Sequence, residues 1–271
     1  MTNHDQPNLH AIDTGGSGQP VILIHGWPLS HKAWENQVQA LERGGFRVIA
    51  YDRRGFGASE KPDAGYDYDT LAADLHRMIE EKDLRDVVLV GFSMGGGEVA
   101  RYVGLYGEDR IGKLVFASAV PPYLMKTDDN PDGPLDEATA KEFETSLKDD
   151  RETFFKGFAE DFFTAGGELV VPQEEVDSAV ALCLQSDQTA ALQTMDAWAN
   201  TDFREDLKKI TKPTLVLHGD SDGVVPFEGS GKRTHEMVDG AELHVIEGAP
   251  HGCNVSHTEE FNRALISFLQ S

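Results

Sequence analysis

The chain has few cysteines, few basic side chains and no long apolar run. Only two of its 271 residues are cysteine, Cys183 and Cys253, which argues against a disulfide framework and predicts free thiols in a reducing cytoplasm. No apolar run of about 18 residues is present, so no membrane span is expected, and the polar N-terminus lacks the pattern of a signal peptide. With 24 basic against 47 acidic side chains, the formal net charge is −23. This charge argues against binding to nucleic acids, whose protein partners are basic, and against anionic membranes.

Apolar runs and amphipathic stretches alternate along most of the chain. With 39% hydrophobic residues, the chain is able to bury a sizeable core, as one large domain or two small ones. Strands are predicted at 20–24, 46–51, 113–119, 214–218 and 242–246, in the run that begins at Val87, and as a short edge strand within 8–14. Helices are predicted at 33–43, 69–82 and 258–269, with Asp69 or Thr70 capping the second. This order predicts an α/β fold, a mostly parallel central sheet flanked by helices.

One long segment interrupts this alternation. Residues 126–209 form an acidic, helix-like stretch between two predicted strands. We interpret this stretch as a helical cap inserted before the last two strands, in a single structural unit whose core comprises 1–125 and 210–271. Five phenylalanines recur in the stretch at helical spacing: Phe154, Phe155, Phe158, Phe162 and Phe163. They are expected to pack between helices, and together they are candidates for the wall of an apolar acyl pocket.

The most informative stretch is the turn Gly91-Phe92-Ser93-Met94-Gly95, which follows the apolar run and precedes a helix-like pattern. Gly-x-Ser-x-Gly between a strand and a helix is typical of a nucleophile held on a sharp turn. Such a turn forces the serine towards positive φ, at a cost of roughly 1–3 kcal/mol, and the flanking glycines have no Cβ to clash. We predict that Ser93 is a nucleophile. The alternative is a Gly/Ser-rich turn that only links a strand to a helix.

A serine hydroxyl needs an adjacent base to become a good nucleophile at neutral pH. Ligands of open α/β sheets bind beyond the carboxyl ends of the strands, so the base is expected just after a strand and downstream of Ser93. Of the ten histidines, His251 fits best, because it lies in the loop that follows the last predicted strand. His25 and His218 also stand at strand ends, and we expect them to shape their loops.

An acid is needed to orient the imidazole and to stabilise its charged form. Asp220 and Asp222 compete for this role in the loop after 214–218. Asp220 lies nearer the strand end, where an aspartate bonds to the amides of its own turn. Asp222 is therefore the candidate acid.

The negative charge that forms on an attacked carbonyl oxygen needs backbone N–H donors. Met94 is one candidate, because it begins the helix after the turn, where the helix dipole favours negative charge. Trp27 is the second, since it follows the strand 20–24 and the pair His25-Gly26. Pro28 has no N–H and is unable to donate.

Seven motifs follow one another along nearly the whole chain: His25-Gly-Trp-Pro-Leu29, Tyr51-Asp-Arg-Arg-Gly-Phe-Gly-Ala-Ser59, Val90-Gly-Phe-Ser-Met-Gly-Gly-Gly-Glu-Val-Ala-Arg-Tyr102, Asn130-Pro-Asp-Gly133, Thr201-Asp-Phe203, His218-Gly-Asp-x-Asp-x-Val-Val-Pro226 and Pro250-His-Gly252. With them the sequence resembles the α/β-hydrolase group of cofactor-free haloperoxidases, arylesterases and perhydrolases. The order Ser93, Asp222, His251 is also the α/β-hydrolase order. The resemblance implies the α/β-hydrolase fold, these three residues as a catalytic triad, and Trp27 and Met94 as oxyanion donors.

The same resemblance implies an enzyme that needs no metal, haem or organic cofactor. Its expected reaction is the hydrolysis of small carboxylic esters through an acyl-enzyme. With hydrogen peroxide in place of water, the product becomes a peracid that oxidises halide, and Pro28 beside the oxyanion loop favours this reaction. A homo-oligomer is also implied. The candidate pocket residues are Trp27, Pro28, Met94, Phe154, Phe158, Phe162 and Val225.

Two features depart from this group. Its members begin with a longer pair of strands, so one sheet edge is expected to be short here. Cys253 stands after His251-Gly252, where an apolar residue is expected, and we interpret it as a buried filler rather than a second nucleophile. Ser93 argues against haloalkane dehalogenases and epoxide hydrolases, which carry aspartate at this turn. A lactamase, a hydroxynitrile lyase and a ligand-binding receptor without turnover stay open as alternatives.

Overall fold

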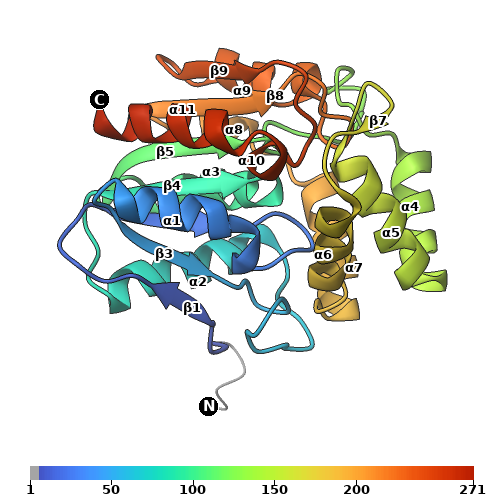
Figure 1. Cartoon of the computed structure of the whole chain (residues 1–271), viewed down its shortest axis with the longest axis horizontal. Helices are drawn as coiled ribbons and strands as arrows, with labels where there is room; N and C mark the ends of the chain where they lie inside the picture. The colour runs from blue at the N-terminus through green and yellow to red at the C-terminus, as the bar shows by residue number, and fades with distance from the viewer. Residues whose placement is uncertain (1–5) are drawn as a thin grey trace.

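Seven strands form one sheet at the centre of the computed structural model, which describes residues 6–271. In space they follow the order β1-β3-β2-β4-β5-β8-β9 (Figure 1). In chain order they are β1 (Ala11–Asp13), β2 (Pro20–Ile24), β3 (Arg47–Tyr51), β4 (Val87–Phe92), β5 (Ile111–Ala117), β8 (Thr214–Gly219) and β9 (Glu242–Ile246). Neighbouring strands are parallel except β1 and β3, which pair antiparallel. The mostly parallel sheet predicted from the sequence is confirmed.

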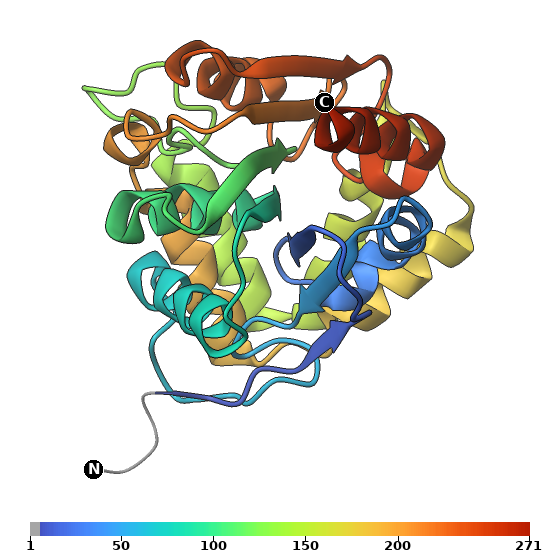
Figure 2. The ribbon, with the colours of Figure 1, turned by 90° about the vertical axis from the view of Figure 1, so that its left-hand side faces the viewer.

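Helices cover both faces of the sheet, because each parallel pair of strands needs a crossover connection. α1 (Glu35–Arg43) and α11 (Thr258–Gln270) lie on one face (Figure 2). α2 (Tyr68–Glu81), α3 (Met94–Tyr106) and α9 (Gly231–Met237) lie on the other. As a result all six residues of the central strand β4 are buried. The strand that carries Ser93 at its end is thus held on both faces.

Some element ends differ from the prediction. The cap of α2 is neither Asp69 nor Thr70 but Asp67, whose extended backbone lets its carboxylate accept the N–H of Thr70 at 2.9 Å. β5 ends at Ala117, since the positive φ of 42° at Ser118 turns the chain away. The edge strand predicted within 8–14 is reduced to the three residues of β1.

Residues 126–209, which we call the cap segment, are mostly helical. Their elements are α4 (Glu137–Asp149), α5 (Arg151–Phe162), β6 (Thr164–Ala165), β7 (Glu168–Leu169), α6 (Gln173–Cys183), α7 (Gln188–Asn200) and α8 (Arg204–Leu207). α4 to α7 stand at one end of the sheet (right in Figure 1). Within residues 6–271, no helix has both the length and the apolar character needed to cross a membrane.

The shorter helices lie beside the loops that follow the strands. They are η2 (His31–Trp34), η3 (Phe227–Gly229) and α10 (Cys253–Ser256). η2 follows the loop after β2, η3 follows the loop after β8, and α10 begins two residues after His251. These are the three loops in which the sequence analysis places Trp27, Asp222 and His251.

Candidate active site

Ser93 stands on a strained turn between β4 and α3. Its φ is 54° and its ψ is −120°, a region that costs roughly 1–3 kcal/mol for a residue other than glycine. Three backbone hydrogen bonds hold it there: Ser93 N–H donates to the carbonyl of Ala117, and the carbonyl of Ser93 accepts the N–H groups of Gly96 and Val120. A Cβ on Gly95 would collide with the carbonyl oxygen of Ile24, so glycine is needed for the helix to start so close to β2.

Three predicted residues meet at this turn. His251 Nε2 lies 3.0 Å from Ser93 Oγ, and His251 Nδ1 lies 2.7 Å from Asp222 Oδ2. The imidazole is fully buried, and the serine and aspartate are each 6% exposed. Both ring nitrogens are therefore engaged, one by the hydroxyl and one by the carboxylate. This is the arrangement by which a base accepts the proton of a hydroxyl while a carboxylate orients the ring.

Asp222 is held as a carboxylate by several donors. Its Oδ1 accepts the N–H groups of Val224 and Val225 at 2.9 and 2.7 Å, and its Oδ2 lies 3.2 Å from His218 Nε2. Burial alone would raise the pKa of this carboxyl, but the neighbouring His251 and the hydrogen bonds from His218 and His251 lower the pKa to about 2. The Asp222 side chain is therefore ionised at neutral pH.

The contact of His218 with the acid is not predicted from the sequence, which assigns this histidine only to loop shaping. His218 is fully buried at the end of β8, and its Nε2 also lies 2.9 Å from the carbonyl of Val225. His218 thus contacts both the Asp222 carboxylate and Val225, whose backbone N–H donates to that carboxylate. The signal that points to it is its spacing of four residues before Asp222.

The competing residues have other contacts. Asp220 Oδ1 accepts the N–H of Gly248 at 2.7 Å, so this carboxylate joins the two loops rather than touching the base. His25 Nε2 accepts the backbone N–H of Arg53 at 3.1 Å. Cys253 is buried, with its Sγ 3.4 Å from the hydroxyl oxygen of Ser118, as expected for a filler beside the histidine loop.

The two predicted oxyanion donors flank Ser93. Met94 is the first residue of α3, and the loop after β2 passes so close that a Cβ on Gly26 would lie 3.1 Å from Ser93 Cβ. Within residues 6–271, neither the backbone N–H of Trp27 nor that of Met94 donates to another group of the chain. Both amides are thus free for an oxyanion next to Ser93 Oγ. The indole N–H of Trp27 donates instead to the carbonyl of Ala191 in α7, at 3.0 Å.

A cavity of about 670 Å³ opens above Ser93. Aromatic rings form its inner wall, with Trp27 and Phe158 packed edge to face at 5.2 Å between ring centroids and Trp27 and Trp198 at 6.0 Å. The other apolar lining residues include Val120, Leu124, Leu135, Phe143, Phe154, Met195, Val224, Val225 and Pro226. The cavity therefore suits an apolar acyl or aryl group.

Of the predicted pocket residues, Trp27, Phe154, Phe158 and Val225 line this cavity. The structure places Pro28, Met94 and Phe162 outside the lining. Met94 is fully buried, because α3 starts with its side chain in the core. The ring of Phe162 packs on His251 instead of facing the cavity. Phe143 and Trp198 are the two aromatic lining residues that sequence reasoning missed, and the only signal for either was its place in the cap segment.

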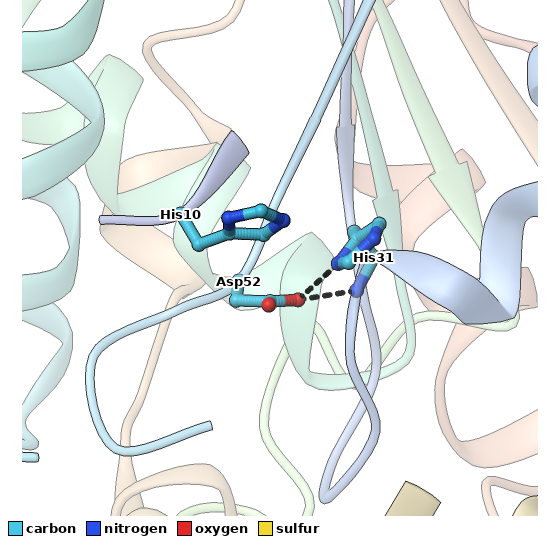
Figure 3. A group of neighbouring side chains, drawn as sticks. All are labelled: His10, His31 and Asp52. Carbon is cyan, nitrogen blue, oxygen red and sulfur yellow. Dashed lines mark hydrogen bonds and ion pairs between the residues drawn. The ribbon is translucent and has the colours of Figure 1, made fainter. Parts of the chain in front are cut away.

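One group of side chains within residues 6–271 has the residue types and spacing of a metal site. It consists of His10, His31 and Asp52 (Figure 3). None of the three lines the cavity above Ser93.

A parallel sheet with a serine on a strand-to-helix turn, followed in the chain by an acid and a histidine, is the arrangement of α/β hydrolases. The sequence profile of the alpha/beta hydrolase fold family matches residues 19–257, and the chain belongs to this family. The α/β-hydrolase fold expected from the motifs is confirmed.

Individual relatives cover almost the whole chain. A non-heme chloroperoxidase of Kitasatospora aureofaciens is 44% identical, and the aligned region covers 94% of this chain and 93% of the relative. A bifunctional esterase/perhydrolase of Acinetobacter calcoaceticus is 38% identical and covers 100% and 99% of the two chains. A crystal structure of a bromoperoxidase from Bacillus anthracis has a TM-score of 0.96 at 49% identity, covering 98% of this chain and 96% of the other. The resemblance to the haloperoxidase, esterase and perhydrolase group is thereby confirmed.

Proposed function

We propose that the protein hydrolyses small carboxylic esters, with Ser93 as nucleophile, His251 as general base and Asp222 as the orienting acid. The observation that carries the proposal is the chain of contacts at the floor of the cavity. His251 lies 3.0 Å from the serine hydroxyl and 2.7 Å from the carboxylate. An apolar cavity of about 670 Å³ above it leaves room for the substrate.

In the proposed first step, His251 Nε2 takes the hydroxyl proton as Ser93 Oγ attacks the acyl carbon. The amides of Trp27 and Met94 donate to the oxyanion that forms. His251 then gives its proton to the leaving alcohol, and the acyl group remains bound to Ser93. Water, deprotonated by His251, attacks this ester and releases the carboxylic acid and the free serine.

Hydrogen peroxide is proposed as a second nucleophile for the acyl-enzyme. Attack by one of its oxygens releases a peracid in place of the acid, and the peracid oxidises halide outside the site. The similarity to a bifunctional esterase/perhydrolase supports this side reaction. Pro28, next to the donor Trp27, is the residue that the resemblance connects with it.

Replacement of the nucleophile tests both reactions at once. Ser93→Ala is expected to lower kcat for ester hydrolysis by a factor on the order of 10⁵ to 10⁶ and to abolish peracetic acid formation from acetate and peroxide. A fluorophosphonate probe is expected to label the wild type and not the variant. Peroxide activity retained by Ser93→Ala would place that reaction elsewhere, and an unlabelled wild type would favour a receptor.

A substrate panel separates the alternatives that keep the same triad. Esters of increasing acyl length, lactams and cyanohydrins are compared at equal enzyme concentration, with and without peroxide. Faster turnover of lactams or cyanohydrins than of any ester would favour a lactamase or a hydroxynitrile lyase. A cytoplasmic location and a homo-oligomeric state stay predictions.

A further inference from the structure

We propose that His10, His31 and Asp52 bind a divalent transition-metal ion of the Zn²⁺ class, at a site separate from the cavity above Ser93. The three residues come from three parts of the chain at one edge of the sheet (Figure 3). His10 precedes β1, His31 begins η2, and Asp52 follows β3. Each offers one ligand atom, and these atoms lie within 4.8 Å of one another.

The residue types select the metal. Two imidazoles and one carboxylate form a ligand set that suits Zn²⁺ and neighbouring transition metals. Ca²⁺ and Mg²⁺ prefer sites made of oxygen ligands. The site therefore favours Zn²⁺, Co²⁺ or Ni²⁺ over the alkaline earth ions that are abundant in cells.

The environment of Asp52 favours a cation. Its side chain is completely buried, and within residues 6–271 its only ion-pair partner is His31, at 2.7 Å between Nδ1 and Oδ1. Oδ1 also accepts the backbone N–H of His31, whereas Oδ2 accepts a single hydrogen bond, from Ala58 N–H at 2.8 Å. His31 Nδ1 and Asp52 Oδ1 share a hydrogen-bond proton, and a metal ion would take the place of that proton between the two atoms. A bound ion would also supply the positive charge that a buried carboxylate needs.

The two histidines are placed to complete the site. Their ring centroids lie 5.0 Å apart, and His31 is bonded to Asp52 through one ring nitrogen. The backbone of His10 is tied to the same region, because Asp52 N–H donates to its carbonyl at 2.8 Å and its own N–H donates to Ser59 Oγ. The imidazole of His10 is exposed, so an ion is able to enter and water is able to fill the remaining positions.

A metal at this place would connect the ends of distant segments. β1 has only three residues and forms the edge of the sheet. Its neighbour His10 would be joined through the ion to η2, which follows the oxyanion loop, and to the end of β3. The expected role is therefore structural, and the inference does not depend on the proposed ester hydrolysis.

Binding is tested with the full chain free of a polyhistidine tag, by calorimetric titration with Zn²⁺ and by the visible absorption of Co²⁺. The wild type is expected to bind one ion per chain, with an absorption band typical of nitrogen and oxygen ligands. His10→Ala and His31→Ala are each expected to weaken binding by about 10- to 100-fold or more, as the loss of even an outer partner of a metal ligand does.

The matched control is His244→Ala. His244 Nε2 lies 3.1 Å from Glu260 Oε1, so it forms an imidazole–carboxylate pair that is not part of the group of His10, His31 and Asp52. This variant is expected to bind as the wild type does. Thermal unfolding in EDTA checks that each variant is folded, and added Zn²⁺ is expected to raise Tm in the wild type and the control only. The proposal would be overturned if His10→Ala and His31→Ala bound Zn²⁺ as tightly as the wild type does, or if the wild type showed no saturable binding.

Discussion

Phe162 packs edge-on against the imidazole of His251, with ring centroids 4.9 Å apart and ring planes at 90°. It is the last residue of α5, and its backbone carbonyl accepts the N–H of Gly252 at 2.8 Å. A Cβ on Gly252 would come within 2.6 Å of the Phe162 ring. The cap segment therefore holds the histidine loop in place in addition to lining the cavity.

Loss of this contact is expected to act on the chemical step. Phe162→Leu should lower kcat for ester hydrolysis by roughly 10- to 100-fold, because small displacements of a catalytic group have effects of this size, and should leave KM nearly unchanged. Phe158→Leu is the matched control, since Phe158 lines the cavity, and it should change KM instead. Steady-state kinetics with p-nitrophenyl esters measure both. A change in KM alone for Phe162→Leu would contradict the positioning role.

The exposed part of the cavity wall, which we call the rim, carries negative charge. Among the cavity's lining residues are Glu142, Asp149, Asp150 and Asp161, and no Lys, Arg or His of the described chain is among them. Esters with a carboxylate in the acyl tail should therefore have a lower kcat/KM than neutral esters of the same size, and esters with an ammonium group a higher one. The difference should shrink in 0.5 M salt, because salt screens exposed charges. Equal values for the three esters at low salt would contradict this reading of the rim.

A single substitution isolates the rim from the overall charge. Asp161→Asn should reduce the preference for cationic over anionic esters. Asp239→Asn makes the same change in net charge at an exposed position outside the cavity, and it should leave the preference as it is. The ratio of kcat/KM for the two charged esters is the quantity to compare.

Both cysteines are expected to be unreactive in the folded protein. Burial raises the pKa of Cys253 to about 12 and that of Cys183 to about 12, and only the thiolate form attacks a disulfide reagent. At pH 8, Ellman's reagent should label neither thiol until guanidinium unfolds the chain, after which it should label both. Rapid labelling of the native protein together with loss of activity would instead mean that Cys253 is accessible to the reagent in the folded state.

His25 makes the stability of the protein depend on pH. Burial, and then the charge of Arg53, lowers the pKa of His25 from 6.5 to about 3. Below pH 6.5 the unfolded chain binds a proton that the native imidazole does not accept. The free energy of unfolding therefore falls as the pH is lowered from about 6.5 to about 3, by up to ~1.4 kcal/mol per pH unit from this group.

The variant His25→Gln tests this assignment by denaturant unfolding at several pH values. It should be less stable than the wild type at pH 7, because the bond to the Arg53 amide is perturbed. Its stability should nevertheless fall less steeply between pH 6.5 and 4. Parallel slopes for the two proteins would mean that another group causes the acid sensitivity.

The meeting of Ser93, Asp222 and His251 could be predicted from the sequence. Each lies in the turn or loop that follows a strand, and the carboxyl ends of parallel strands lie at one edge of the sheet. The orientation of Phe162 does not follow, since the helical spacing of the five phenylalanines is the same whether a ring faces the cavity or the histidine. The contact of His218 with Asp222 requires the actual path of the loop between them. The grouping of His10 with His31 and Asp52 joins segments that share no motif, so only the folded chain shows it.

The indole N–H of Trp27 donates to the carbonyl of Ala191, so one residue joins the loop of the proposed oxyanion donor to α7 of the cap segment. If α7 swung outward as a lid, it would pull this loop with it and spoil the alignment of the amide with the serine. Substrates and products are therefore expected to pass through the existing mouth, with α7 staying in place. The width of that fixed entrance would then set the size of the largest ester that the enzyme accepts, and outward motion of α7 would not.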